Sequence, residues 1–135
     1  MLKRFDFSFS NEAQKLHLEA KVSEFDLIYK IHEAEGFDGL KASDEWQIYS
    51  SDAVMWLKSF IELRIFNWDS SYSNASISDC TLKKAPKWQL EVEEDEESNI
   101  PVQHVVGLNS YPYNFPAFLD LIKQLLGLPY LVLEV

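Results

Sequence analysis

The chain has 135 residues, of which 47% are hydrophobic and 14% aromatic, and its formal net charge is −10. This composition supports one domain, residues 1–135, with its own core, and it excludes disorder of the whole chain. The strong negative charge argues against nucleic acid and anionic membrane as partners.

Two stretches near the N-terminus alternate apolar and polar residues. Phe5, Phe7 and Phe9 carry the first, and the second runs from Leu16 to Val22. A period of two is typical of half-buried strands, and the polar link 10–14 suits a hairpin between them.

The next segments predict two helices with a short strand between them. Ser23 as an N-cap and Gly36 as a stop favour a helix over 24–35, although a strand over 27–32 is an alternative. Residues 46–49 predict a short strand. Ser51 as an N-cap and the long apolar stretch after it predict a helix over 53–66.

The middle of the chain predicts a loop and three strands. Residues 67–74 are rich in Asn, Asp and Ser, as loops are. Residues 77–83 and 87–93 alternate and predict a hairpin, with Trp88, Leu90 and Val92 facing inward. A further strand over 102–106 follows Pro101.

The C-terminal part predicts a helix and a final strand. Asn114 as an N-cap, Pro116 in the first turn and Gly127 at the end delimit the helix. Residues 130–135 are apolar on both faces apart from Glu134, which predicts a strand inside the sheet. The order is β-β-α-β-α-β-β-β-α-β, and it predicts an α+β fold with a single mixed, mainly antiparallel sheet, about three helices, and the helices on one face.

The sequence contains no motif of a common nucleotide-binding site, hydrolase or metalloprotease. The single cysteine, Cys80, cannot form an internal disulfide, and with no secretory signal or membrane-length apolar run this favours a cytoplasmic protein. His32 and Glu35 could share a metal on a helix, but ordinary surface charges explain them better. We therefore expect no cofactor, no bound metal and no catalytic residues.

Acidic residues dominate the last third of the chain. Residues 88–135 contain eight acidic residues and one basic residue, Lys123, and six of the acidic residues lie within seven positions. We expect this run to steer a basic protein partner. The run consists of Glu91, Glu93, Glu94, Asp95, Glu96 and Glu97.

The function that fits these features best is that of an acidic inhibitor. An immunity or antitoxin-type protein can cover a basic, nuclease-like toxin by presenting carboxylates where the toxin grips phosphate. The aromatic residues of the predicted loops would anchor the complex, and they are Trp68, Tyr72, Tyr111 and Tyr113.

Two other classes remain open. One is a non-enzymatic adaptor or accessory module, of the phage or secretion-system type, that binds through a sheet edge. The other is a small enzyme on a cone-like α+β scaffold, with a pocket around His104, Cys80 or Asp120. The acidic run could also serve solubility alone, and the sequence does not indicate an oligomeric state.

Overall fold

The protein folds around one mixed sheet of seven strands, in the order β4-β3-β2-β1-β6-β7-β5. The computed structural model describes residues 1–24, 26–73, 85–128 and 132–134. The strands are β1 (Leu2–Ser10), β2 (Lys15–Ser23), β3 (Asp26–Glu35), β4 (Gln47–Ile48), β5 (Ser71–Ser73), β6 (Lys87–Glu94) and β7 (Gln103–Leu108). The helices are α1 (Ala53–Glu62) and α3 (Phe115–Leu126), with the one-turn 3₁₀ helices η1 (Ile65–Asn67) and η2 (Glu96–Ser98).

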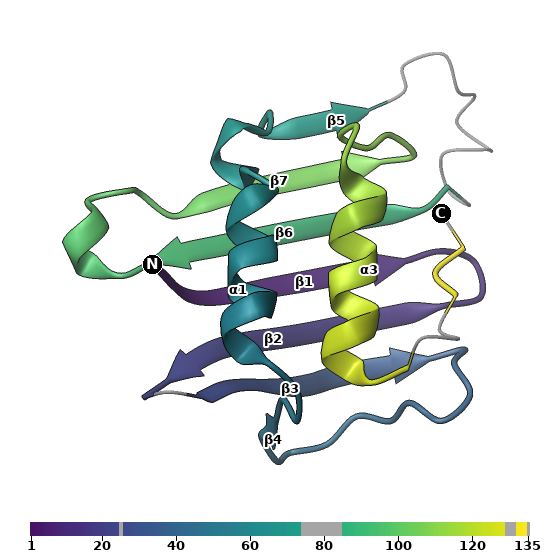
Figure 1. Ribbon diagram of the computed structural model, residues 1–135. Helices are drawn as coiled ribbons and strands as arrows, with labels where there is room; N and C mark the ends of the chain where they lie inside the picture. Colours follow the sequence, from purple (N-terminus) through teal and green to yellow (C-terminus); the bar gives the residue numbers. More distant parts are fainter. Residues whose placement is uncertain (25, 74–84, 129–131, 135) are drawn as a thin grey trace.

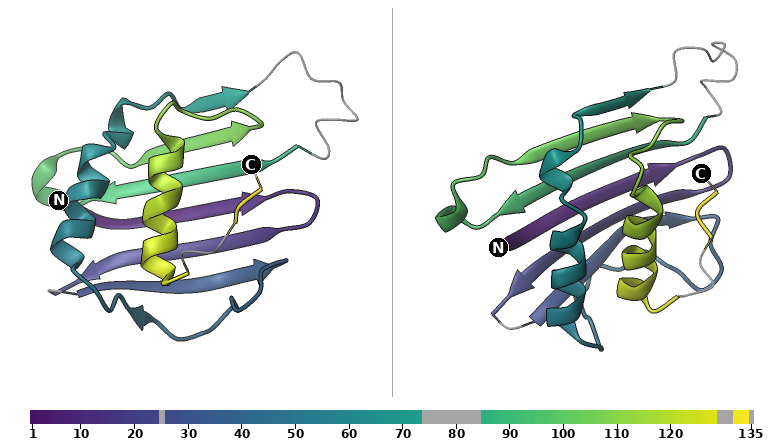
Figure 2. Two further views of the ribbon diagram at one scale, coloured as in Figure 1. Left: turned by 45° about the vertical axis from the view of Figure 1, so that its right-hand side comes forward. Right: turned by 45° about the horizontal axis from the view of Figure 1, so that its top comes forward.

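Both helices lie across the same face of the sheet (Figures 1 and 2). Neighbouring strands pair antiparallel except β5 and β7, which pair parallel. The predicted α+β class, the single mixed sheet and the one-sided helices are therefore confirmed. The described residues contain two α-helices rather than about three.

The core lies between the helices and the middle of the sheet. Phe5 and Phe7 of the central strand β1 are fully buried. The Phe5 ring stacks on Phe60 of α1, with centroids 5.4 Å apart, and Phe7 packs edge-on against Phe118 of α3 at 5.0 Å. The alternation in β1 thus places each Phe on the helix side and leaves its polar residues on the other side.

The predicted helix over 24–35 is wrong, because this segment is the strand β3. Ser23 pairs with Asp26 across the turn from β2, and Glu24 takes a left-handed conformation with φ 56°. The polar residues that resemble a helix cap therefore build a tight hairpin. Hydrogen bonds along β2 and burial of Leu27 and Ile31 favour the strand over the helical alternative.

The predicted helix over 53–66 is correct in place but too long. Asp52, not Ser51, is the N-cap, because its carboxylate accepts a hydrogen bond from the Met55 amide at 3.1 Å. The helix ends at Glu62, and Arg64 turns the chain with φ 52° before η1. The predicted loop over 67–74 contains the short strand β5.

The pairing of β6 and the structure of the chain end differ from the sequence predictions. Residues 77–83, predicted to pair with 87–93, lie outside the described residues. β6 pairs with β1 and β7. The predicted strand over 130–135 is wrong for Val132, Leu133 and Glu134, which form no strand. Their backbone instead binds the side chain of Gln14, beside the β1–β2 hairpin.

Within the described residues, neither helix has the length and apolar character needed to cross a membrane.

Candidate functional site on the uncovered face of the sheet

The face of the sheet opposite the helices is not covered by any described element (Figure 2). Strand register arranges its side chains in rows that cross the sheet. One row contains His104, Glu91, Asp6, Glu19 and Lys30. The row nearer the other end contains Ser73, Leu108, Lys87, Ser10 and Lys15.

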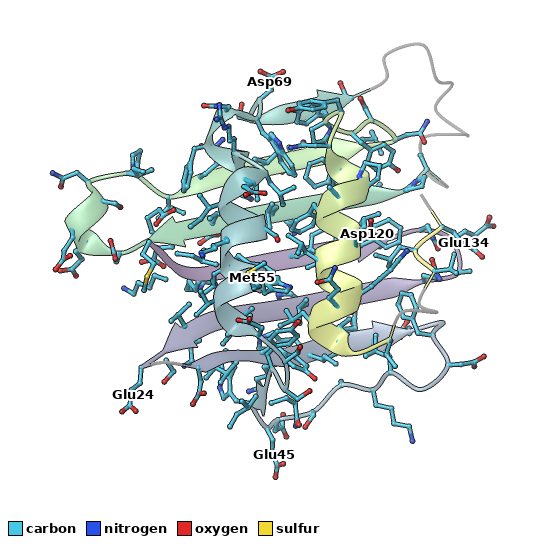
Figure 3. All side chains as sticks on the ribbon, viewed as in Figure 1. Glu24, Glu45, Met55, Asp69, Asp120 and Glu134 are labelled. Atoms are coloured by element: carbon cyan, nitrogen blue, oxygen red, sulfur yellow. The ribbon has the colours of Figure 1, made fainter. Side chains whose placement is uncertain are left out.

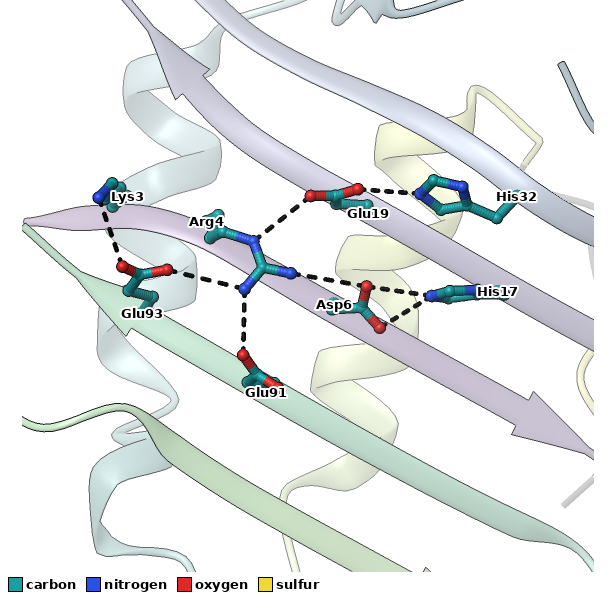
Figure 4. A network of polar contacts seen from close by, with 8 residues as sticks. All are labelled: Lys3, Arg4, Asp6, His17, Glu19, His32, Glu91 and Glu93. Atoms are coloured by element: carbon teal, nitrogen blue, oxygen red, sulfur yellow. Dashed lines mark hydrogen bonds and ion pairs between the residues drawn. The ribbon is translucent and has the colours of Figure 1, made fainter. Parts of the chain in front are cut away.

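Arg4 is the centre of a network of ion pairs on this face (Figure 4). Its guanidinium lies within 4 Å of four carboxylates, and its own side chain is 26% exposed. Lys3 adds a pair to Glu93 at 3.3 Å. The Arg4 distances are 3.1 Å to Glu91, 3.4 Å to Glu19, 3.6 Å to Asp6 and 3.7 Å to Glu93.

Two histidines extend the network along β2 and β3. His17 Nε2 lies 2.9 and 3.0 Å from the two carboxylate oxygens of Asp6. His32 Nε2 lies 2.9 Å from a carboxylate oxygen of Glu19. The two imidazole rings lie with their centroids 4.7 Å apart. The bulge in β3 between the partners of His17 and Leu18 accompanies this approach.

The network changes the acidity of its members. Partial burial raises the pKa of Glu19, but the hydrogen bond from His32 and the attraction and hydrogen bond of Arg4 outweigh it, so the net pKa lies below its usual value of 4.5. For Arg4, burial lowers the pKa, and the contacts with Glu91 and Glu19 more than offset that effect. Both groups are therefore held in their charged forms.

The acidic run lies at one end of this face and beyond it. Glu91 and Glu93 belong to β6 and are paired with Arg4. Glu94 and Asp95 contact the terminal amine of Met1 at 2.7 and 3.5 Å. Glu96 and Glu97 are exposed in η2 and make no ion pair among the described residues.

This end of the molecule remains negative despite its ion pairs. We name it the acidic end and define it as the eight carboxylates and five cationic groups named below. Eight carboxylates face five cationic groups, so the net charge is −3 with neutral histidines. The carboxylates are Asp6, Glu19, Glu91, Glu93, Glu94, Asp95, Glu96 and Glu97, and the cationic groups are the Met1 amine, Lys3, Arg4, Lys21 and Lys30.

Three of the four proposed aromatic anchors surround Trp88, near the start of β6. Trp68 is buried, and Tyr72 and Tyr111 are half-buried and stack on Trp88, with centroids 6.0 and 6.3 Å from it. Tyr113 is 94% exposed. On β6, Trp88 lies three residues, about 10 Å, from Glu91 and six residues, about 20 Å, from Glu94, and its side chain points to the core face, opposite Glu91 and Glu93. The structure therefore does not bring the two predicted groups together.

Two adjoining hollows lie on the uncovered face. The smaller, of about 280 Å³, is lined by Arg4, Asp6, Ser8, His17, Gln89, Glu91 and His104. The larger, of about 600 Å³, shares Ser8, His17 and Gln89 with it and continues toward β5. The sequence patterns do not indicate these hollows, although the polar members of the β1 and β2 alternation mark the face.

The other sequence candidates are dispersed. His104 lies in the smaller hollow, as expected for a polar strand residue. Asp120 is on the outer side of α3, beside a separate hollow on the helix side (Figure 3). Cys80 lies outside the described residues. His32 and Glu35 are in a strand, and no group of three or more potential metal ligands occurs in the part of the chain that is described.

Comparison with protein families, with curated proteins and with solved structures gave no match to this chain.

Proposed function

We propose that the protein is a non-enzymatic inhibitor that binds a basic protein, of the immunity or antitoxin type, through the acidic end of its uncovered sheet face. The partner we propose is a nuclease-like toxin, because such an enzyme must present positive charge where it binds phosphate. Carboxylates placed against that surface compete with nucleic acid for it.

The observation that supports this proposal is the negative charge that the ion pairs leave uncompensated. Arg4 and Lys3 hold the carboxylates of β1, β2 and β6 in fixed positions, as a docking surface requires. Glu96 and Glu97 project beyond the strand and are free to act at a distance. The carboxylates held by Arg4 and Lys3 suit contact with a partner, and Glu96 and Glu97 suit steering of its approach.

The aromatic part of the sequence hypothesis needs a change. Trp68, Tyr72 and Tyr111 pack around Trp88 and stabilise the fold, so we no longer propose them as anchors. Tyr113 is exposed, in the loop between Tyr111, which stacks on Trp88, and α3. In the refined proposal, charge and shape on the sheet face dominate recognition.

The alternatives have less support. An adaptor that adds a partner strand would use the outer edges of the sheet. β4 and β5 have only two and three residues, which disfavours such pairing, but β4 covers only Ile28 and Tyr29 of β3. A small enzyme could use the Asp6–His17 pair beside His104. However, His17 Nε2 already faces Asp6, and both side chains are partly solvated.

The test compares two variants of equal charge. Glu96→Lys with Glu97→Lys reverses the two unpaired charges of η2. Asp44→Lys with Glu45→Lys makes the same change of net charge in an exposed loop beside β4. Proteins captured from a host lysate at low salt identify a partner, and its association rate is then measured with each variant.

We expect the η2 variant to associate at least tenfold more slowly at low salt, with a reduced salt dependence, and the loop variant to change the rate less than threefold. We also expect the wild-type protein to inhibit nuclease activity of the captured partner. Equal rates for the two variants, or a captured partner with an acidic surface, would refute the proposal.

A further inference from the structure

The larger hollow on the uncovered face lies outside the acidic end. It spans the ends of β1, β2, β6, β7 and β5, and its volume of about 600 Å³ is in the range of small-molecule sites. The docking of a basic partner proposed above uses the acidic end and does not use this hollow.

Small side chains form the floor of this hollow. Ser8 and Ser10 of β1 line it from the centre of the sheet, and Ser71 and Ser73 of β5 line it from the edge. Serine is a weak strand former compared with β-branched and aromatic residues, so four serines on one face contribute little to the stability of the strands. Their hydroxyl groups do supply donors and acceptors within a depression.

Two lysines stand on either side of the central serine. Strand register places Lys15 of β2 and Lys87 of β6 directly beside Ser10. Two strand spacings separate the lysine backbones by about 10 Å, so their flexible side chains can converge above Ser10. Neither lysine makes an ion pair among the described residues, and Glu33 is the one acidic residue among those that line the hollow.

The side of the hollow nearer β7 is apolar. Val106 and Leu108 face it, and Val106 is 41% exposed. His17 and Gln89 close the end next to the smaller hollow. A ligand here meets positive charge and hydroxyl groups over β1 and aliphatic side chains over β7.

From this arrangement we propose that the larger hollow binds a small molecule that carries an anionic group, a carboxylate, sulfonate or phosphate, on an apolar body. Lys15 and Lys87 bind the anionic group above Ser10, and Val106 and Leu108 contact the apolar body. The proposal does not depend on the inhibitor function, because the residues and the end of the sheet differ.

The test measures binding of naphthalene-1-sulfonate by isothermal titration calorimetry and by amide chemical shifts. Naphthalene-1-methanol lacks the anionic group and therefore measures what that group contributes to binding. Inorganic phosphate lacks the apolar body and measures what that body contributes. Lys15→Gln with Lys87→Gln removes both charges, and Ser10→Leu fills the floor without entering the core. Lys41→Gln with Lys58→Gln, two exposed lysines away from this hollow, is the matched control.

We expect one sulfonate per chain, with shifts at Ser10 and Val106, and at least tenfold weaker binding of the alcohol and of phosphate. Both hollow variants should weaken sulfonate binding tenfold or more, and the control pair should change it less than twofold. Absence of saturable binding to the wild-type protein, equal binding of the alcohol, or equal loss in the control pair would overturn the proposal.

Discussion

The side chain of Gln14 holds the backbone on both sides of Leu133, and its Oε1 atom accepts the Glu134 amide at 3.0 Å. Its Nε2 atom donates to the Val132 carbonyl at 2.8 Å. Gln14 is only 7% exposed. The buried Gln14 amide, together with Asn11 Nδ2, which donates to the Glu134 carbonyl at 3.1 Å, therefore replaces the strand partner that the sequence pattern of the last residues led us to expect.

We expect Gln14→Met to lower the free energy of unfolding by about 1–3 kcal/mol, because two backbone groups lose their partner while the side-chain volume is kept. Urea unfolding measures this change. Hydrogen exchange of the Glu134 amide gives a direct readout, and exchange should become faster in the variant. An unchanged exchange rate would mean that the segment is held by other contacts.

Leu133 itself should contribute through packing. It is 6% exposed and belongs to the main core cluster. We expect Leu133→Ala to cost about 2–5 kcal/mol, as for other buried leucines, and Val132→Ala, at a position that is 63% exposed, to cost less than about 0.5 kcal/mol. Equal urea midpoints for Leu133→Ala and the parent would contradict this assignment.

The sequence predicted those elements whose patterns agree with their tertiary surroundings. Alternation identified β1, β2 and β6, and the caps of α3 delimited that helix. The segment from Asp26 to Glu35 was predicted wrongly because its polar residues fit a helix cap and a hairpin turn equally well. Only the hydrogen bonds offered by β2 decide between them.

The site was predictable only in part, because its contacts are long-range. The acidic run was visible, but the pair between Arg4 and Glu91 joins residues 87 positions apart. Nothing local to either residue indicates that pair. Likewise, the burial of Trp68 and the stacking of Tyr72 on Trp88 depend on η1 and β5 meeting β7, which the loop pattern of residues 67–74 did not indicate.

The indole of Trp88 occupies the space that a side chain at Gly107 would need, since the two residues are cross-strand partners on the core face. Trp88 Nε1 also donates to the Ser110 carbonyl at 3.0 Å, which limits how far the ring can move. We expect Gly107→Ala to cost about 1–3 kcal/mol by overpacking, measured by thermal and urea unfolding. Val106→Ala, on the uncovered face, is the control and should cost less than Gly107→Ala.

Arg4 should stabilise the fold by compensating the carboxylates around it. We expect Arg4→Met to cost on the order of 1–3 kcal/mol, between the values for exposed and buried ion pairs, because the site is partly solvated. The loss should shrink in 1 M salt, since screening weakens the carboxylate repulsion that remains. Arg4→Lys should recover only part of the stability, because one ammonium cannot reach the carboxylates on β2 and β6 together.

A double-mutant cycle separates this effect from general loss of packing. In the Arg4→Met background, Glu91→Gln removes one of the uncompensated charges and should restore stability. If the two changes are additive within about 0.3 kcal/mol, Arg4 and Glu91 do not interact energetically, and any stabilisation by Arg4 comes from its other carboxylates or from packing.

Glu19 gives the fold a dependence on acidic pH. Its pKa is lower in the folded state than its usual value of 4.5, because the contacts with His32 and Arg4 outweigh the effect of burial. Because its pKa is lowered, ionised Glu19 stabilises the fold fully above about pH 4.5. This stabilisation is lost as the pH falls through the lower pKa that Glu19 has in the folded state. We therefore expect Glu19→Gln to destabilise the protein at pH 6 and to make a smaller difference at pH 3. Urea unfolding of the variant and the parent at both pH values measures this, with the exposed Glu45→Gln as control (Figure 3). A difference between parent and Glu19→Gln that stays constant from pH 6 to pH 3 would show that the contacts of Glu19 do not depend on its charge.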